Sequence, residues 1–308
     1  MAVIGTGLIG TSVALAARQQ GITVYLSDRN EHHARTASAL GAGVIARPRE
    51  PVDLAIIAVP PSEVGPVLVQ QQALRTADCY TDVAAVKQLP EQHVLQNAAE
   101  PFRYVGGHPM AGSERSGPRA GRADLFRGRA WALTPSAFSG DAALARGLEL
   151  LEVCGAAPVL MDSRLHDERM ALTSHVPHVM ASLTAAQLVG TPDQVPVLVG
   201  RGFRDATRIA RGEAMLWSDI LTSNAASIAA VLTELQDDLA SLVNALIALT
   251  AGDDNQAALA TVTDLLERGI AGLAGIPDTG PDTEILWLTA LAEQAALRRS
   301  VSEPTVQQ

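Results

Sequence analysis

The chain has 308 residues, 47% of them hydrophobic and 18% charged, and its mean hydropathy is +0.15. Such a chain can bury a sizeable core and is long enough for about two domains. The formal net charge of -10 and the pI near 5.1 argue against a nucleic-acid partner, because phosphates require clustered Lys and Arg. We expect a cytoplasmic protein without a membrane partner, since no apolar run approaches the roughly 20 residues that span a bilayer and the first residues lack a signal-peptide pattern.

The residues that could bind a metal do not follow a metal-site spacing. Cys79 and Cys154 lie far apart in the sequence and fit neither a zinc nor a redox motif, so we expect two buried, reduced thiols. A zinc site formed by His166, His175 and His178 is the alternative, but no further ligand follows at the spacing that a metalloprotease site requires. No metal is therefore expected.

Short runs rich in β-branched residues alternate with helical stretches over residues 1–160. The runs are AVIG, ITVYLSD, GVIA, LAIIAVP, CYTDVA, YVGGHP, AWALTP and PVLMD. This α/β alternation predicts a doubly wound, mainly parallel sheet with helices on both faces. From about Ser163 the strand-like runs stop, and apolar residues recur at helical spacing. We therefore expect a dinucleotide-binding domain over residues 1–162 and an all-α domain for substrate binding and dimerisation over residues 163–308.

The clearest helical pattern runs from Ile228 to about Leu249, where apolar residues recur every three or four positions. One such stripe is enough to pack a helix within its own domain. Because this helix is long and rich in alanine around the stripe, we expect part of the second domain to pack against a second copy of the chain.

A glycine pattern typical of dinucleotide binding lies at the start of the chain. Gly5, Gly7 and Gly10 form G-x-G-x-x-G between the run AVI and an apolar helical stretch. The first glycine permits a tight turn, the second lets the backbone approach a pyrophosphate, and the third lets the helix pack on the strand. The helix N-terminus then faces the phosphates, so Leu8 and Ile9 belong to the candidate site.

The run ITVYLSD ends in Asp28, where a carboxylate can accept hydrogen bonds from the adenosine ribose hydroxyls. The same carboxylate repels a 2′-phosphate, so we expect NAD rather than NADP, although the neighbouring Arg29 could neutralise such a phosphate. Val59 and Pro60 end another predicted strand at the same edge of the sheet and complete the candidate cofactor site.

The stretch GGHPMAGSERSG places His108 after a predicted strand and before a loop that contains Ser113 and Glu114. His108 should therefore lie at the carboxyl edge of the sheet, close to the nicotinamide. Histidine is a natural general base there, because its pKa lies near neutral pH. The alternative is a surface or capping histidine, which a single histidine in a loop more often is.

The stretch HDERMALTSHVPHVMASL has helical spacing, which places Ser174 and His178 on one face and directs His175 elsewhere. Pro177 cannot donate to the carbonyl of Thr173, so we expect a kink there. Both Ser174 and His178 are candidate site residues.

The stretch GRGFRDATRIARGEAMLWSDIL gathers four arginines in an otherwise acidic chain. Arg208 could bind a carboxylate through its bidentate guanidinium, and Asp205 lies one turn away. Trp217 follows as a candidate wall of the pocket, although an apolar helix residue is more often plain core. The alternative for the arginines is a solvated basic surface.

Taken together, three motifs resemble the prephenate and arogenate dehydrogenase family: HPMAGSERSG, SHVPH, and GFRDATRIA followed by MLW, in this order. The resemblance runs from Val3 to roughly Leu249. It implies NAD- or NADP-dependent oxidation of the ring carbinol of a dianionic cyclohexadienyl acid. Loss of the ring carboxylate then gives an aromatic product for tyrosine synthesis. It also implies a homodimer formed through the helical domain.

Position by position, the resemblance implies that His108 takes the proton from the ring hydroxyl. His178 and Ser174 would orient the substrate, and Arg208 would hold its side-chain carboxylate. Glu114, beside His108 in the motif, would help to gate the site.

One departure from the family pattern concerns the substrate. In TDVAAVK the chain has Ala85 where the family commonly carries a serine. The difference leaves arogenate or 4-amino-4-deoxyprephenate open as alternatives to prephenate. A relative that binds NAD as a sensor or scaffold is a further alternative. A β-hydroxyacid dehydrogenase is another, but that class usually places a lysine where this chain has histidines.

Overall fold

The computed structural model describes residues 1–113, 115–251, 255–276 and 286. The chain forms two compact units, the first containing Met1–Asn224 and the second beginning at Ala225. The described strands end at Leu160, and helices follow from Ser163. The boundary between the two compact units, at Ala225, therefore lies later in the chain than the change from strands to helices near Ser163. The helices from Ser163 to Ser223 belong to the same compact unit as the sheet. A functional boundary between residues 162 and 163 stays a prediction.

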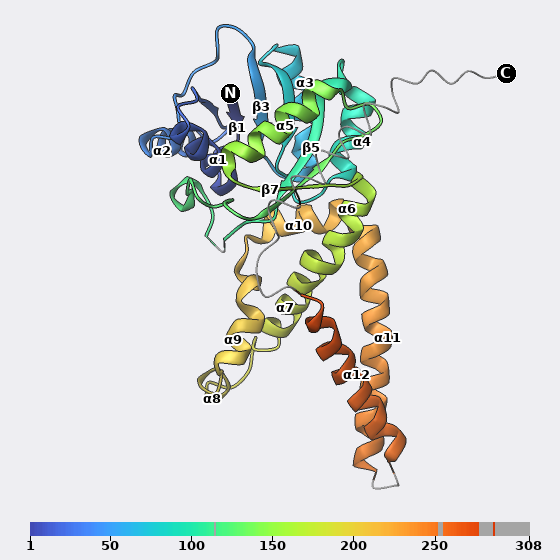
Figure 1. Cartoon of the computed structure of the whole chain (residues 1–308). Helices are drawn as coiled ribbons and strands as arrows, with labels where there is room; N and C mark the ends of the chain where they lie inside the picture. The colour runs from blue at the N-terminus through green and yellow to red at the C-terminus, as the bar shows by residue number, and fades with distance from the viewer. Residues whose placement is uncertain (114, 252–254, 277–285, 287–308) are drawn as a thin grey trace, which may run out of the picture. The chain divides into compact units, whose positions relative to one another are not determined.

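Within the described residues, seven strands form one sheet in the order β2-β1-β3-β4-β5-β6-β7 (Figure 1). Every neighbouring pair is parallel except β5 and β6. The predicted mainly parallel sheet is therefore confirmed. The strand order reverses between β1 and β3, and doubly wound sheets bind ligands at the carboxyl edge of such a switch point. The strands are β1 Ala2–Ile4, β2 Tyr25–Ser27, β3 Val52–Ile57, β4 Ala77–Asp82, β5 Tyr104–Pro109, β6 Ala130–Thr134 and β7 Ala157–Leu160.

Helices cover both faces of the sheet. Successive strand residues point to opposite faces and therefore pack into different cores. Val3 and Ile56 pack into a core with α1 and α5, whereas Ile4 and Ile57 pack into a second core with α3 and α4. The helices between the strands are α1 Leu8–Gln19, α2 Glu31–Ala39, α3 Pro61–Ala73, α4 Gln88–Asn97 and α5 Asp141–Cys154 (Figure 1).

One predicted strand does not form. The run GVIA makes only an isolated bridge between Val44 and Tyr25. Val44 and Ile45 remain more than half exposed, so the run gains little from burial, and Pro48 soon follows without a backbone N–H. The prediction of a strand here was wrong, because a short apolar run does not show whether other residues of the fold will bury it.

The helical part of the first unit continues from the sheet. Its elements are α6 Ser163–Met170, a π turn Ala171–His175, α7 Val176–Ala186, α8 Gln194–Val197, α9 Arg201–Thr207, a 3₁₀ turn Arg208–Arg211 and α10 Ala214–Ser223. The wide π turn lies just before Pro177, where the missing N–H leaves a carbonyl without its helical donor. Helix α10 packs against α3, and the backbone N–H of Ser62 donates to Asp219 over 3.2 Å.

A buried ion pair lies where β4 ends. Lys87, the single lysine of the chain, is fully buried and paired with the buried carboxylate of Asp82. Its ammonium also donates to the carbonyl of Gly107 over 2.7 Å. Asp82 accepts further hydrogen bonds from the Tyr104 hydroxyl over 2.6 Å and from the N–H of Ala84 over 2.8 Å. These contacts satisfy both charges and join β4 to β5 at the carboxyl edge.

The second unit contains α11 Ala225–Thr250 and α12 Gln256–Ala274, which pack against each other. Arg268 of α12 binds Asp238 of α11 over 2.8 Å. Many apolar side chains on both helices stay exposed in the single chain: Leu235, Leu239, Val243, Leu246, Ile247, Leu249, Leu259, Leu266, Ile270 and Leu273. No single described helix is long and apolar enough to cross a bilayer, and only α10 with α11, as a bent pair, reaches that length and composition.

Candidate active site

The parallel strands bring the predicted cofactor residues to one edge of the sheet. Gly5 follows β1, Asp28 follows β2, and Val59 follows β3. His108 lies near the end of β5, which runs parallel to β4. Residues far apart in the sequence therefore share the carboxyl edge of one sheet.

The three glycines of the first loop are required for different steric reasons. Gly5 has φ 97°, and a Cβ there would lie 2.1 Å from the carbonyl oxygen of Ala58. A Cβ on Gly10 would lie 2.0 Å from the carbonyl oxygen of Gly5, so this glycine lets α1 approach the strand. A Cβ on Gly7 would meet no protein atom within 4 Å. The space beside Gly7 and the uncapped N-terminus of α1 thus fit a pyrophosphate.

Asp28 is held beside this loop by protein donors. Its Oδ2 accepts hydrogen bonds from the N–H of Thr6 over 2.6 Å and from the Thr6 hydroxyl over 2.8 Å. Its Oδ1 accepts from the N–H of Asn30 over 2.8 Å. The carboxylate is fixed in place and keeps acceptor capacity for a ribose hydroxyl. Arg29 is exposed.

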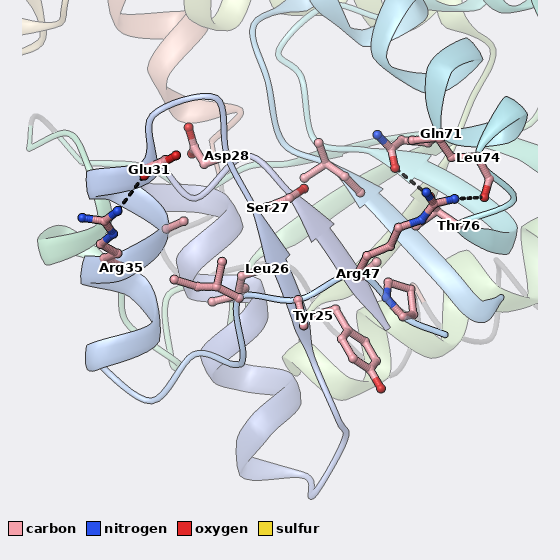
Figure 2. Close-up of a pocket in the computed structure, with 16 residues that line it drawn as sticks. Tyr25, Leu26, Ser27, Asp28, Glu31, Arg35, Arg47, Gln71, Leu74 and Thr76 are labelled. Atoms are coloured by element: carbon pink, nitrogen blue, oxygen red, sulfur yellow. Dashed lines mark hydrogen bonds and ion pairs between the residues drawn. The ribbon is translucent and has the colours of Figure 1, made fainter. Parts of the chain in front are cut away.

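A cavity of about 530 Å³ borders Asp28 and Ser27 and extends along β2 toward Ala2 and Thr76 (Figure 2). Figure 2 shows Arg35 paired with Glu31 and Arg47 bound to the carbonyl of Leu74. The cavity adjoins the adenosine end of the candidate cofactor site. His108 is not among its lining residues.

A chain of hydrogen bonds extends from His108 into the protein interior. Nδ1 of His108 lies 2.9 Å from Nε2 of His166, and Nδ1 of His166 lies 2.8 Å from Oδ1 of Asp167. His166 and Asp167 are fully buried, whereas His108 is partly exposed. The strand β5 and the helix α6 thus meet through an imidazole, a second imidazole and a carboxylate.

The Asp167 carboxylate also binds the start of α4. It accepts hydrogen bonds from the N–H of Lys87 over 2.8 Å and from the N–H of Gln88 over 2.9 Å. Free N–H groups at a helix N-terminus stabilise a negative charge. The backbone carbonyl of Asp167 accepts in turn from the side-chain amide of Asn224 over 2.7 Å. One residue therefore joins α4, α6 and the end of α10.

The surroundings of His108, His166 and His175 favour the neutral forms of their imidazoles. Burial, followed by the neighbouring His166, lowers the pKa of His108 well below its ordinary value. Burial likewise lowers the pKa of His166, although its hydrogen bond to Asp167 opposes the shift. For His175, burial lowers the pKa to about 4. Uncharged imidazole can accept a proton, so His108 is suited to act as a base at neutral pH.

A second group surrounds Trp217. The ring of His178 stacks on the indole with centroids 3.4 Å apart and planes 12° apart. The ring of His175 is nearly perpendicular to the indole, at 81°, with centroids 6.3 Å apart. A Cβ on Gly212 would lie 2.3 Å from Nε1 of Trp217, so only glycine fits there. Nδ1 of His178 and Nε2 of His175 are buried without a hydrogen-bond partner in the described part of the chain.

The remaining predicted site residues make few contacts with other side chains. Ser174 is half-buried in the π turn. Arg208 is exposed, has no ion-pair partner among the described residues, and belongs to the 3₁₀ turn that packs against α7. Asp205 lies 3.6 Å from Arg201 rather than pairing with Arg208. The exposed hydroxyl of Ser113 accepts from the N–H of Arg115 over 3.1 Å.

Glu114 lies outside the described residues. Sequence reasoning missed the site role of His166 and Asp167, which came into view only as metal candidates or not at all. No local pattern marks this pair, because the contact of His166 with His108 spans 58 residues.

Two family models match the chain: the nucleotide-binding domain of prephenate dehydrogenase over residues 13–160 and its dimerization domain over residues 162–261. The Probable prephenate dehydrogenase NovF of Streptomyces niveus is 40% identical over 94% of this chain and 80% of its own length. The cyclohexadienyl dehydrogenase of Zymomonas mobilis is 35% identical over 82% of this chain and 90% of its own length.

A solved structure has the same fold. Prephenate dehydrogenase from A. aeolicus, in complex with hydroxyphenyl propionate and NAD+, superposes with a TM-score of 0.76 and 24% identity. The match covers 89% of this chain and 96% of the other.

The glycine loop generates a matched pair of variants. Gly7→Ala should change the stability of the free protein by about 1 kcal/mol or less, because the new methyl meets no protein atom. It should weaken NAD binding, since the methyl occupies the space a pyrophosphate needs. Gly10→Ala should instead destabilise the protein by about 1–3 kcal/mol, because a methyl there overlaps the carbonyl of Gly5.

Thermal denaturation without cofactor and calorimetric titration with NAD measure the two effects separately. An unchanged NAD affinity in Gly7→Ala, or equal destabilisation by both substitutions, would contradict this assignment of the loop.

Proposed function

Because the chain belongs to the prephenate dehydrogenase family, we propose that it catalyses the NAD-dependent oxidative decarboxylation of prephenate to 4-hydroxyphenylpyruvate in tyrosine biosynthesis, in the cytoplasm. It is an oxidoreductase of this type. The observation that carries the proposed chemistry is the position of the His108 imidazole at the carboxyl edge of the sheet that also carries the glycine loop.

The cofactor residues present fit NAD. The space beside Gly7 and the N-terminus of α1 would take the pyrophosphate, and the fixed carboxylate of Asp28 would bind the adenosine ribose. Asp28 favours NAD over NADP because a 2′-phosphate would approach a negative charge. When bound, NAD supplies the acceptor for the hydride of the ring carbinol.

His108 would take the proton of the ring hydroxyl as the carbinol is oxidised. A neutral imidazole can do this, and general-base assistance contributes about 10²- to 10⁴-fold in rate. The ring carboxylate then leaves as carbon dioxide, and its bonding electrons return to the ring, which becomes aromatic. The enzyme therefore mainly has to hold the ring close to His108 and to the cofactor.

The helical segment offers groups for the rest of a dianionic substrate. Nε2 of His175 and Nδ1 of His178 have no hydrogen-bond partner among the described residues, so a substrate hydroxyl or carboxylate could complete their hydrogen bonds. Arg208 is exposed and could bind the side-chain carboxylate in a bidentate manner. Ser174 and Trp217 would orient the substrate and line its pocket.

A second candidate substrate differs from prephenate in the substituent on the ring. Ala85 lies half-buried in the segment between β4 and α4 and carries no hydroxyl. A serine at this position could bind a ring hydroxyl, whereas a methyl group could not. This observation favours 4-amino-4-deoxyprephenate as the second candidate substrate. Arogenate differs from prephenate in the side chain, where an amino group replaces the keto oxygen, so the residue at position 85 does not bear on it.

We also propose that the enzyme is a homodimer. The second family model is described as a dimerization domain, and it covers residues 162–261. The apolar side chains exposed on α11 and α12 would cost solubility in a monomer, and contiguous apolar patches of this kind mark protein interfaces. A second copy of the chain is the occupant that closed, symmetric assembly favours.

The proposed activity predicts the appearance of NADH when the purified enzyme is given prephenate and NAD. Prephenate should be used with a higher kcat/KM than arogenate or 4-amino-4-deoxyprephenate, and NAD should be preferred to NADP. His108→Asn should lower kcat by about 10²- to 10⁴-fold. His32→Asn, which changes an exposed histidine on α2, is the control and should keep full activity. Absence of NADH with all three substrates would refute the proposal.

The depressed pKa of His108 predicts the pH dependence of the reaction. Only the unprotonated imidazole can accept a proton, so activity is lost as pH falls through the pKa of His108. Burial lowers that pKa well below about 6.5, with contributions from His166, Lys87 and His175. The value of kcat/KM should therefore stay level from about pH 8 to about pH 6.5 and fall only at lower pH. A decline centred at or above pH 6.5 would contradict this assignment.

The dimer proposal predicts that a charge in the exposed stripe of α11 separates the subunits. Leu239→Glu should shift the molecular mass in solution from dimer toward monomer, because it would bury an unpaired carboxylate in an apolar interface. Asn244→Glu adds the same charge at an exposed position of α11 that lies off the apolar stripe, and it is the matched control. Size-exclusion chromatography with light scattering measures the masses. A monomeric wild-type protein would be inconsistent with the proposal.

A further inference from the structure

We propose that His166 and Asp167 are positioning residues, which fix His108 in the tautomer that leaves its Nε2 unprotonated and directed away from the buried pair. The inference rests on the proposed function, because it explains how His108 is kept ready as a base. It concerns two side chains that contact neither substrate nor cofactor in this assignment. They act through the imidazole of His108.

The direction of the hydrogen bonds is set at the buried end of the chain. The carboxylate of Asp167 already accepts from two backbone donors, the N–H groups of Lys87 and Gln88. A carboxylate in that position can only accept hydrogen bonds. The nitrogen of His166 that lies 2.8 Å from Oδ1 must therefore carry a proton. This places the proton of His166 on Nδ1.

The second step follows from the neutrality of His166. A neutral imidazole has one protonated nitrogen, and the other nitrogen is an acceptor. Burial of the side chain favours the neutral form, which leaves Nε2 of His166 as an acceptor. Nδ1 of His108 lies 2.9 Å from this acceptor and has to donate to it. The unprotonated nitrogen of a neutral His108 is then Nε2.

The third step concerns the rigidity of the arrangement. His108 lies on β5 and His166 on α6, and both elements are joined to α4 by buried contacts. The ammonium of Lys87 binds the carbonyl of Gly107, the residue before His108. The backbone of His108 and the imidazole of His166 are thus fixed relative to one another.

No other described side chain makes a hydrogen bond to the ring of His108. Ala85, with its methyl side chain, cannot supply one. Without an acceptor at Nδ1, the ring could place its proton on either nitrogen and rotate about its side-chain bonds. Positioning errors of about 1 Å can lower a rate by about 10²-fold, so a buried acceptor has a large effect on catalysis. His166 is the residue that provides it.

A direct test uses the enzyme without substrate. In protein with ring-15N-labelled histidine, the two nitrogens of each imidazole report by their NMR shifts whether they carry a proton. Signals of His108 are assigned by their loss in His108→Asn. We expect a protonated Nδ1 and an unprotonated Nε2 in His108 of the wild-type protein. A proton on Nε2 instead would overturn the proposal, whatever the substrate of the enzyme proves to be.

A pair of substitutions at His166 separates positioning from packing. His166→Phe keeps a planar ring but removes the acceptor, whereas the side-chain oxygen of His166→Gln can still accept from Nδ1 of His108. We expect kcat to fall by about 10²-fold or more in the Phe variant, with KM changed by less than about threefold. The Gln variant should recover most of this loss. Asp167 is not the residue to vary, because it also holds the start of α4.

His93→Phe is the matched control, because it makes the same chemical change at a half-buried histidine of α4 that has no contact with His108. It should keep the wild-type kcat. Equal losses in the Phe and Gln variants, or a wild-type kcat in His166→Phe, would overturn the proposal. If His166→Phe fails to fold, as seen in its circular dichroism and NAD affinity, the NMR measurement on the wild-type protein still decides. If no substrate is turned over, the proposed function fails while the tautomer assignment is still measured.

Discussion

The ion pair between Lys87 and Asp82 is the interaction on which the geometry of the candidate site depends. Both charges are removed from water, and each is satisfied by further hydrogen bonds to β4, β5 and the segment between them. Removing one partner of such a pair typically costs about 3–5 kcal/mol, because the other charge is left buried and unpaired. The pair holds Gly107, and therefore the neighbouring His108, in a fixed position. The backbone of Lys87 in turn binds Asp167.

The protein combines an acidic composition with a site whose histidines are neutral. Burial, helped by the neighbouring His166, Lys87 and His175, lowers the pKa of His108 and so keeps its imidazole in the neutral form that can accept a proton. In the proposed function, the exposed Arg208 of the helical segment would bind the negative charge of the substrate, whereas His166 and Asp167 are fully buried. Proton transfer and anion binding would thus be assigned to residues in different dielectric surroundings.

The sequence predicted the regular secondary structure well and the individual side-chain contacts poorly. The glycine loop, the parallel sheet and the long helix follow from local spacing, which reports turn geometry and amphipathicity directly. The run GVIA, however, has the composition of a strand and remains a bridge, because no further strand pairs with it. Asp205 pairs with Arg201, a contact that the sequence analysis did not predict, because several arginines lie within helical reach of this exposed carboxylate. The expected kink near Pro177 is a π turn, which changes the residues that share a helix face.

The sequence alone determined that the first strand, glycine loop and helix form a dinucleotide-binding turn, because the glycine spacing is local and the constraint at Gly10 comes from Gly5, five residues away. The close approach of Ala58 to Gly5 was decided by the tertiary structure. It also located His108 at the end of a strand. Only the tertiary structure showed what His108 binds. His166 lies on a helix 58 residues further along the chain, and its contact with His108 requires that α6 return to the carboxyl edge. Hydrogen bonds over such separations leave no periodic trace in the sequence, since they depend on how whole elements pack and not on local spacing.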